Sequence, residues 1–434
     1  MTAEVNVALT LQVPDLEAID LNSLSETSST ISSLSVHHVG DNDHDVNSFK
    51  SKQLTSSALN KPTETALYLT SDGKTFINTC IAFLGSGVLG LPYAFRQCGI
   101  LMGLITLLGV AACSTYAMIL VVQCKYKLKQ QGERITNYGE IGYFAMGYAG
   151  SFIVNMALVI SQTGFCIAYL IFIASNANKF LDVSKQLVVS VCVPPLVGLS
   201  LLKHMRELAY VAVIADLMCI LGLLVVLNID LTYMEQDHDD IKVIGVVSAV
   251  PFFFGVASYC FEVVIITSLY ATFGICGYLA FGNDTDAVIT LNFDGGGGLA
   301  ILVQVFLCFG LFFTYPVMLF PVFEVLHPMM ACGKNLESPQ PSQMKGTVLR
   351  VSIVFFTAVV AAGIPDFGRF ISFIGSTCCS LLAFIMPAFF HLCLFCDEPP
   401  TWKSRLHHFL LCAMMILGFA MLGVGVVEVF NSVH

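Results

Sequence analysis

Long apolar stretches separated by short polar segments recur along most of this chain. We predict membrane spans near 76–96, 100–123, 151–175, 186–202, 208–228, 299–325, 347–364, 371–396 and 409–430. Stretches of this length can cross hydrocarbon as helices, for which about 17–25 apolar residues suffice. They are far longer than barrel strands and do not alternate between polar and apolar positions. The pattern therefore predicts an all-α polytopic membrane protein.

A further apolar stretch, Val243 to Phe281, is 39 residues long and is interrupted only by Glu262. It is too long for one span and barely long enough for two. The positions of Lys and Arg decide between these readings, because cytoplasmic loops carry an excess of positive charge. With the N-terminus in the cytoplasm, two passes place 15 Lys and Arg inside and 5 outside, whereas one pass places 11 inside and 9 outside. We therefore predict about eleven transmembrane helices, with the C-terminus outside.

Acidic residues concentrate in two polar parts of the chain. Residues 1–73 are rich in Ser, Thr, Asp and Asn and hold ten acidic residues against three lysines. Such a composition buries too little apolar surface to fold, so we expect a disordered cytoplasmic tail, followed by a transmembrane transporter domain over 74–434. The second group is expected to form a loop on the outer side, and it consists of Asp230, Glu235, Asp237, Asp239 and Asp240.

The composition argues against several classes of protein. The chain is 56% hydrophobic and 12% charged and has a net charge of −10, so it offers no basic surface for nucleic acid. No nucleophile–base constellation or phosphate loop stands out, and we expect neither an enzyme nor a cofactor. The 16 cysteines lie mostly within apolar runs, where thiols pack as small hydrophobes. His391, Cys393 and Cys396 are metal-ligand types, but they end an apolar run without a second pair, and we favour packing over a metal site.

The first apolar span contains residues that a simple membrane crossing does not need. Gly85, Ser86, Gly87, Gly90 and Pro92 lie within its middle and second half. Glycine costs about 1 kcal/mol relative to alanine in a helix interior, and proline removes a backbone hydrogen bond. In hydrocarbon, a freed backbone group must find a partner in protein, water or ligand. Helices broken near the bilayer midplane are how many secondary transporters hold their substrates, so this span points to a carrier.

An amino acid zwitterion has the chemistry that an unwound turn can bind. Its carboxylate needs N–H donors at the positive end of a half-helix, and its ammonium needs carbonyl acceptors. Gly85, Ser86 and Gly87 offer both from one turn, because small side chains let a ligand approach the backbone. The alternative is that these glycines only permit close packing of helices.

Other polar residues within the spans are candidates for binding or coupling. Gln162 and Tyr169 are seven residues apart, which places them on one face of a helix, and either ligand contact or interhelical bonding would explain them. Asp216 and Glu262 are carboxyl groups deep in apolar stretches. An ionisable group in hydrocarbon is costly and is by default a candidate for a proton relay, although each could also serve as a structural acceptor or reach water.

Several motifs together resemble the amino acid/auxin permease family. They are the first-span sequence with Pro92-Tyr93-Ala94-Phe95, then Tyr138-Gly139-Glu140, the run Ser161–Ile173, Pro251–Glu262, Gly274–Gly282 and Ile374-Gly375-Ser376-Thr377. The similarity covers nearly everything after the tail. It is closest to the vacuolar neutral amino acid transporters of plants and fungi and to the animal proton-coupled amino acid transporters.

This resemblance implies a fold and a function. The fold is a LeuT-like (APC-type) five-plus-five inverted repeat with broken helices 1 and 6, in which Phe253, Phe254, Gly255 and Ser258 form the break in helix 6. The function is secondary active transport of neutral amino acids, coupled to protons through Glu262 or Asp216. A vacuolar or lysosomal membrane is implied more than the plasma membrane, because an acidic lumen supplies protons. Sodium is the alternative coupling ion, since backbone carbonyls can bind either ion.

The chain departs from the family pattern at one point. Family members carry about two dozen further residues between the Phe-Glu pair of helix 6 and the Gly-x-Cys-Gly-Tyr of helix 7, roughly the length of a span. Here Glu262 is followed at once by Val263 and Val264, so the region between helices 6 and 7 is shortened. This departure motivates a second hypothesis, a membrane amino acid sensor or scaffold that does not transport.

Overall fold

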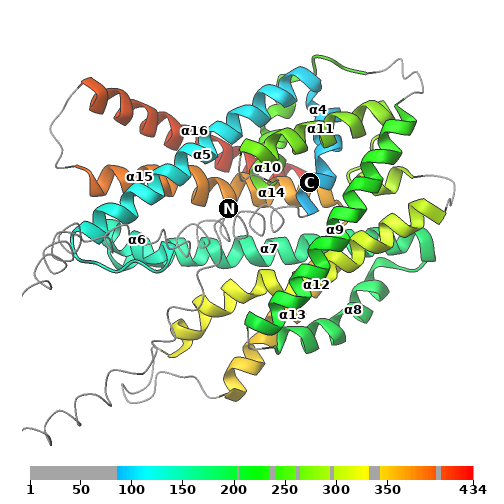
Figure 1. The fold of residues 1–434 in the computed structure, drawn as a ribbon, viewed down its shortest axis with the longest axis horizontal. Helices are drawn as coiled ribbons and strands as arrows, with labels where there is room; N and C mark the ends of the chain where they lie inside the picture. Colours follow the sequence, from blue (N-terminus) through cyan, green and yellow to red (C-terminus); the bar gives the residue numbers. More distant parts are fainter. Residues whose placement is uncertain are drawn as a thin grey trace, which may run out of the picture. The chain divides into compact units, whose positions relative to one another are not determined.

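The computed structural model describes residues 86–202, 205–234, 241–260, 264–293, 298–331, 343–396 and 402–433. Within these ranges every regular element is a helix, and the order of the helices along the chain can be followed in Figure 1. The predicted tail, residues 1–73, and the first part of the first predicted span lie outside the described residues. The described part of the chain confirms the all-α prediction.

Seven helical segments in the described ranges are long and apolar enough to cross a membrane. They lie in α5 (Ile100–Gln130), α7 (Tyr148–Leu181), α9 (Met205–Tyr233), α12 (Gly298–Ala331), α13 (Gln343–Gly363), the stretch from α14 (Phe367–Ile374) to α15 (Met386–Leu394), and α16 (Trp402–Val433). Each coincides with a predicted span. Two shorter apolar helices are α8 (Lys185–Ser200) and α10 (Val250–Cys260), the latter continuing from η4 (Val247–Ala249). The protein is therefore a multi-pass helical membrane protein.

The long apolar stretch from Val243 to Phe281 contains two separate helices. The first is α10, which ends at Cys260, and the second is α11 (Val264–Phe281). Residues 261–263 lie between them, outside the described part of the chain, so the structure gives no position for Glu262. The assignment of the two helices to two membrane passes stays a prediction.

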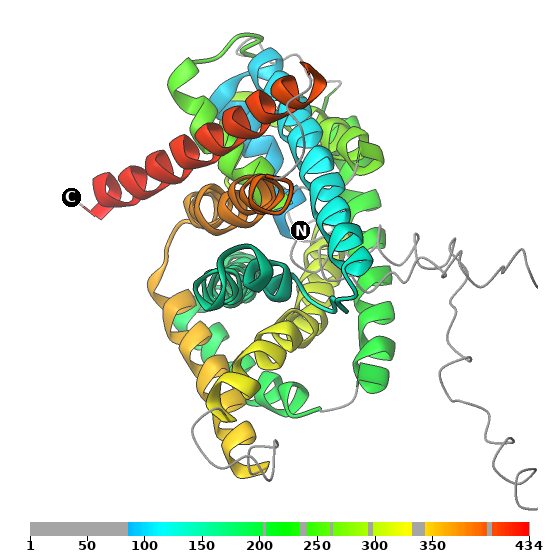
Figure 2. The same ribbon diagram turned by 90° about the vertical axis from the view of Figure 1, so that its left-hand side faces the viewer.

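Two of the spanning segments form the interior. In α7, 72% of the apolar stretch is buried, and in Phe367–Leu394 the share is 61%, against 22–39% in the other five. Figure 2 shows the stretch containing α14 and α15 between α7 and α16. The other helices leave large apolar side chains exposed, as Phe409 and Ile416 of α16 are at 69% and 68%. Lipid accounts for such exposure, because hydrocarbon is as apolar as these side chains.

The first predicted span is not one continuous α-helix where it is described. Ser86–Gly90 form the 3₁₀ turn η3, and α4 (Leu91–Cys98) follows with Pro92 in its first turn. Gly99, at φ +80°, then ends α4 and turns the chain into α5. The first N–H groups of α5 are satisfied from outside the helix, because Ile100 and Leu101 donate to the carbonyls of Lys242 and Val243 at 3.2 and 2.9 Å.

One short helix has a signal in the sequence that the span pattern does not use. The helix α6 (Tyr138–Met146) begins with a capping box. The Glu140 N–H donates to Asn137 Oδ1 at 3.0 Å, and a carboxylate oxygen of Glu140 accepts the Asn137 N–H at 3.4 Å. This reciprocal pair satisfies two of the N–H groups that a helix start leaves free, and α6 then packs along α7.

The predicted acidic outer loop is wrong at its first member. Asp230 lies on α9, which runs on to Tyr233, and its side chain is fully buried. The apolar positions around it, Val226 and Ile229, continue the buried face of the helix and carry the carboxyl group inward with them. The other four acidic residues of this group, at positions 235, 237, 239 and 240, lie outside the described residues.

Candidate functional site

The 3₁₀ turn η3 meets the C-terminal end of α10. η3 packs against α10, α11, α14 and α7. A Cβ atom added at Gly87 would lie 2.6 Å from Cys260 Sγ and 2.7 Å from the ring of Tyr259, so only glycine allows this approach. Ser86 opens the turn, but its side chain and all of Gly85 lie outside the described part. Of the two explanations for these glycines, close packing accounts for Gly87, and this packing brings η3 against α10. The predicted break of helix 6 at Phe253, Phe254, Gly255 and Ser258 is wrong, because α10 runs as a continuous α-helix from Val250 to Cys260 and Gly255 serves close packing against Ser372 instead.

Phe253 and Phe254, two of the three phenylalanines of α10, are buried against other helices. Phe253 meets Phe95 of α4 edge to face, with ring centroids 4.9 Å apart, and Phe254 packs on Phe384 at 5.5 Å. Their exposed fractions are 0% and 4%. These contacts make the surroundings of α10 apolar, and they fix α10 to α4 on one side and to the 381–385 segment on the other.

Gly255 permits a close backbone contact between α10 and the stretch that follows α14. A Cβ atom at Gly255 would lie 2.6 Å from Ser372 Oγ, and one at Gly375 would overlap the carbonyl oxygen of Gly255. Ser372 Oγ also donates to the carbonyl of Phe252 at 3.1 Å. The motif beginning at Ile374 is therefore the partner of α10, although about 120 residues separate them in sequence.

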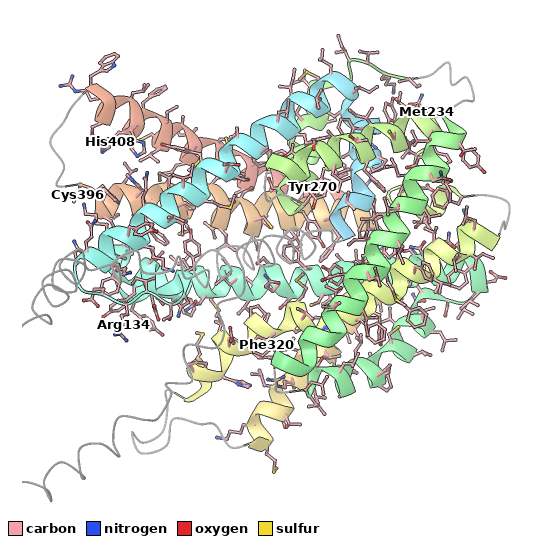
Figure 3. The ribbon with its side chains drawn as sticks, in the orientation of Figure 1. Arg134, Met234, Tyr270, Phe320, Cys396 and His408 are labelled. Carbon is pink, nitrogen blue, oxygen red and sulfur yellow. The ribbon has the colours of Figure 1, made fainter. Side chains whose placement is uncertain are left out.

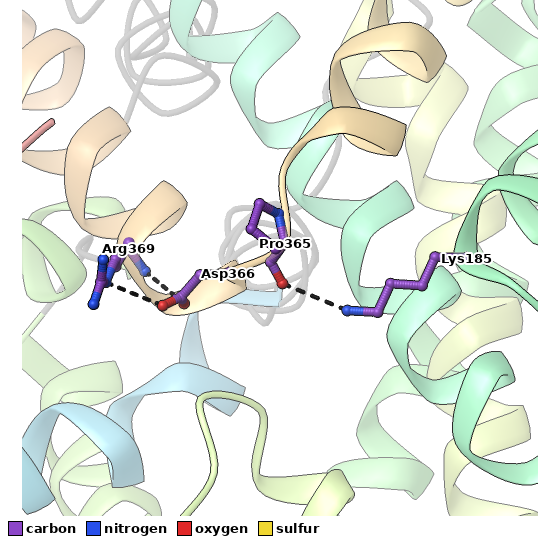
Figure 4. A network of polar contacts seen from close by, with 4 residues as sticks. All are labelled: Lys185, Pro365, Asp366 and Arg369. Atoms are coloured by element: carbon purple, nitrogen blue, oxygen red, sulfur yellow. Dashed lines mark hydrogen bonds and ion pairs between the residues drawn. The ribbon is translucent and has the colours of Figure 1, made fainter. Parts of the chain in front are cut away.

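The partner stretch has an unusual backbone and a firmly held start. Gly375–Cys379 and Leu381–Ile385 form the π-helical turns η7 and η8. Such turns are rare and are frequently found at functional sites. Figure 4 shows how α14 begins: Asp366 accepts the Arg369 N–H at 3.1 Å and pairs with Arg369 Nε at 3.2 Å, while Lys185 of α8 donates to the Pro365 carbonyl.

The hydroxyl of Ser258 is the most informative polar group at this junction. Its side chain is 2% exposed, and its Oγ has no hydrogen-bond partner among the described residues. A buried polar group left without a partner costs about 1–3 kcal/mol. Ser258 directly precedes Tyr259, the residue against Gly87, so the two residues lie in the same turn of α10. An unsatisfied donor and acceptor is thus kept within one helical turn of the contact between η3 and α10.

The third predicted helix approaches the same place. Phe165 of α7 meets Tyr259 edge to face, with centroids 4.8 Å apart. Gln162 lies three residues earlier on α7, on the same helical face, and is 1% exposed. The structure therefore brings Gly87, Ser258 and the Gln162 face of α7 to one region around Tyr259. The motif Pro251–Glu262 contains Tyr259, but its sequence does not reveal that this ring joins the three helices.

The two carboxyl groups predicted to couple an ion are not part of this junction where they are described. Asp216 is half-buried on α9, between Val213 and Leu217, which are 65% and 57% exposed. The adjoining residues Ala215 and Cys219 face Gly310 of α12, not η3 or α10. Glu262 lies outside the described residues.

His391, considered above as a possible metal ligand, belongs to a chain of hydrogen bonds at the other end of α15. Tyr116 Oη and His407 Nδ1 are 2.7 Å apart, His407 Nε2 and His391 Nδ1 are 3.4 Å apart, and His391 Nε2 and Gln123 Oε1 are 3.1 Å apart. Two neutral imidazoles satisfy the whole chain when each donates through Nε2. His391 also stacks on Phe395 at 4.1 Å. These contacts agree with the packing role. The neighbouring Cys396 and His408 are labelled in Figure 3.

Comparison with known proteins identifies the family. Residues 70–266 and 262–430 match the family described as transmembrane amino acid transporter protein. The fold is that of a multi-pass helical membrane protein with an interrupted first span, and the chain belongs to this family of transporters. This confirms the resemblance inferred from the motifs, and it agrees with the expectation that the chain is not an enzyme.

The relatives are transporters from plants, insects and fungi. "Amino acid transporter AVT3B" of Arabidopsis thaliana is 35% identical over 84% of this chain and 95% of its own length. "Proton-coupled amino acid transporter-like protein pathetic" of Drosophila melanogaster is 25% identical, covering 74% and 77%. "Vacuolar amino acid transporter 3" of Saccharomyces cerevisiae is 28% identical, covering 71% of this chain and 50% of that protein.

Among solved structures, the chain is similar to a manganese transporter from Eremococcus coleocola. The identity is 12%, the match covers 83% of this chain and 97% of that one, and the TM-score is 0.38. A TM-score this low supports no argument about the present fold.

Proposed function

We propose that this protein is a secondary active transporter that moves neutral amino acids in a proton-coupled manner across a vacuolar or lysosomal membrane. Family membership supports amino acid transport. The word "vacuolar" in the name of the yeast relative supports the location, and "proton-coupled" in that of the fly relative supports the coupling. The full fold in this proposal has about eleven transmembrane helices in a LeuT-like five-plus-five inverted repeat, with helix 1 broken.

The observation that carries the proposed substrate site is the contact of η3 with the end of α10, beside the unpartnered Ser258 hydroxyl. The 3₁₀ turn at Ser86–Gly90 replaces the regular ladder of an α-helix, so its backbone groups differ in direction from those of a continuous span. The zwitterion would bind between this turn and the C-terminal end of α10. Its carboxylate would meet N–H groups of the turn, its ammonium would meet carbonyls, and the Ser258 hydroxyl would contribute one hydrogen bond.

The apolar surroundings favour a neutral side chain on the substrate. Phe165 packs on Tyr259, Phe253 and Phe254 bury the preceding turns of α10, and the polar residues near this region that we can place, Gln162 and Ser258, carry no charge. A charged substrate side chain would be buried without a partner among these residues, at a cost that a neutral one avoids.

Two alternatives have specific support. The family match falls into two stretches that meet at 262–266, where the chain lacks the expected residues between helices 6 and 7. A shortened region would favour a sensor or scaffold that binds amino acids without moving them. A sodium-coupled carrier is the other alternative, since a broken helix can bind either ion.

The test uses the full chain purified and reconstituted into liposomes. We expect labelled neutral amino acids to exchange across the bilayer, and to accumulate against a concentration gradient when a pH gradient is imposed. Accumulation that requires a sodium gradient instead would favour the sodium-coupled alternative. Saturable binding of amino acids without any flux would refute transport and favour the sensor.

A further inference from the structure

Asp230 is a buried carboxyl group that is not part of the proposed substrate site. Its side chain is 0% exposed, and neither carboxylate oxygen has a hydrogen-bond partner among the described residues. It lies in the last turn of α9, where the helix dipole presents its negative end. Burial, missing partners and the dipole each oppose a negative charge at this position.

The carboxyl group is packed between α9, α11 and α4. A Cβ atom added at Gly277 of α11 would lie 3.3 Å from Asp230 Oδ2 and 2.6 Å from Pro92 Cγ of α4, so the bare glycine sits between the two. Figure 3 helps to locate the region, because it labels Met234 and Tyr270. The Met234 N–H donates to the Asp230 carbonyl, one helical turn earlier, and Tyr270 lies on α11.

The groups that face Asp230 are almost all uncharged. On α11, the Cys276 thiol is near enough to interact electrostatically with Asp230, and Tyr278, two residues later, accepts the backbone N–H of Lys242 through its hydroxyl. On α4, Pro92 lies on the other side of Gly277, and Arg96, one turn further along, donates to the Thr285 carbonyl. α12 pairs with α9 in the register Gly222 to Leu307, so the part of α12 opposite Asp230 is Gly298–Val305, which contains no ionisable residue.

On α9 itself, the titratable neighbours are Tyr233, three residues later, and Cys219 and Asp216, 11 and 14 residues earlier. Asp216 is thus about 21 Å away along the helix at 1.5 Å per residue. Within the described part of the chain, no cation forms an ion pair with Asp230. A charged carboxylate would therefore stand alone in an apolar contact.

The surroundings suit a proton better than a metal cation. Hard cations take several oxygen ligands, and the residues around Asp230, namely Gly277, Pro92 and Cys276, have no side-chain oxygen. A proton needs only the carboxylate itself, because binding it forms one O–H bond and removes the charge.

We propose that Asp230 is the group that carries the coupled proton, and that its protonation controls the packing of α11 between α9 and α4. This inference rests on the proposed transport function. Pro92 lies in the first turn of α4, directly after η3, so a change at the contact between Asp230, Gly277 and Pro92 is passed to the turn proposed to bind substrate.

The coupling follows from the two charge states. The protonated carboxyl is neutral and is compatible with the closed contact seen here. When the O–H bond breaks and the proton leaves to water, the bare carboxylate favours any arrangement that opens the contact and hydrates it. The gain or loss of a proton by Asp230 on one side of the membrane is thereby linked to the position of α4 and η3.

The experiment compares the unmodified chain with Asp230→Asn, Asp230→Glu and the matched control Asp284→Asn, in which an exposed aspartate is changed in the same way. All are reconstituted at equal protein content. Counterflow exchange of a labelled neutral amino acid measures movement of substrate without net proton flow. Accumulation driven by a pH gradient measures coupling. Infrared difference spectra recorded over a pH series report the protonated carboxyl directly, without reference to flux.

For Asp230→Asn we expect accumulation to fall at least about tenfold while exchange stays within about threefold of the unmodified chain. Asp230→Glu should recover part of the accumulation, Asp284→Asn should match the unmodified chain, and one protonated-carboxyl band should be absent from Asp230→Asn alone. Full accumulation by Asp230→Asn, or an unchanged infrared spectrum, would overturn the role of Asp230 and leave transport standing. Absence of flux from the unmodified chain under every gradient would overturn the proposed function, and the coupling role with it.

Discussion

Replacing Ser258 by alanine tests whether its hydroxyl contacts the substrate. If it does, the variant should be more stable without substrate and should bind substrate more weakly. The hydroxyl is 2% exposed and has no partner among the described residues, so its removal takes away an unsatisfied group and leaves a cavity no larger than one oxygen atom. The protein without substrate should therefore become more stable, by about 1 kcal/mol.

Substrate binding should change in the other direction. A hydrogen bond to a charged group contributes about 1.5–3 kcal/mol, which corresponds to roughly a 10- to 100-fold weaker apparent affinity when it is lost. We expect Ser258→Ala to raise the half-saturating amino acid concentration for counterflow by about this factor, while thermal unfolding in detergent shifts to higher temperature. Substrate should also stabilise the variant less than it stabilises the unmodified chain.

The matched control is Ser114→Ala on α5. Ser114 is 1% exposed and its hydroxyl is likewise without a partner in the described part of the chain, but it lies two residues from Tyr116, which bonds to His407 of α16. This variant should gain stability without any change in half-saturation. If both serine variants behave alike in transport, Ser258 does not contact the substrate and the placement of the site is wrong.

Three further predictions follow: two concern the packing that positions the site, and one concerns the coupling group. Gly255→Ala should destabilise the protein by about 1–3 kcal/mol in chemical or thermal unfolding, because its Cβ would press on Ser372. The control Gly109→Ala, with no atom within 4 Å of the added Cβ, should be neutral or slightly stabilising. Equal behaviour of the two variants would refute the close contact at Gly255. Asp366→Ala removes the N-cap of α14 and should lower the free energy of unfolding by about 1 kcal/mol in the same assay. An unchanged stability would contradict the contact in Figure 4. Asp216→Asn should reduce pH-driven accumulation less than Asp230→Asn does, and the reverse order would restore Asp216 as the coupling group.

The helices of this protein follow from local sequence, because about 20 apolar residues in hydrocarbon leave the backbone no alternative to helical hydrogen bonding. The 3₁₀ turn at Ser86–Gly90 was also foreseeable, since two glycines, a serine and a following proline oppose an α-helix there. The capping box of α6 could have been found from Asn137 and Glu140, which have the spacing of that motif.

Contacts between distant segments could not be predicted in this way. Nothing local to Gly255 shows that Ser372 and Gly375 lie against it, and nothing local to Gly87 shows that Tyr259 covers it. Asp230 was misplaced for a related reason. Counted with the acidic residues that follow it, it resembled the start of a polar loop, and only the packing of α9 against α11 shows that its carboxyl is buried.

The most direct test of the central claim is an experimental structure of the full chain in lipid with a neutral amino acid bound. The account predicts that the α-carboxylate and ammonium lie between Ser86–Gly90 and the end of α10, with the Ser258 hydroxyl within hydrogen-bond distance of the substrate. An amino acid bound elsewhere, with Gly87 still closed against Tyr259 and Cys260, would contradict it.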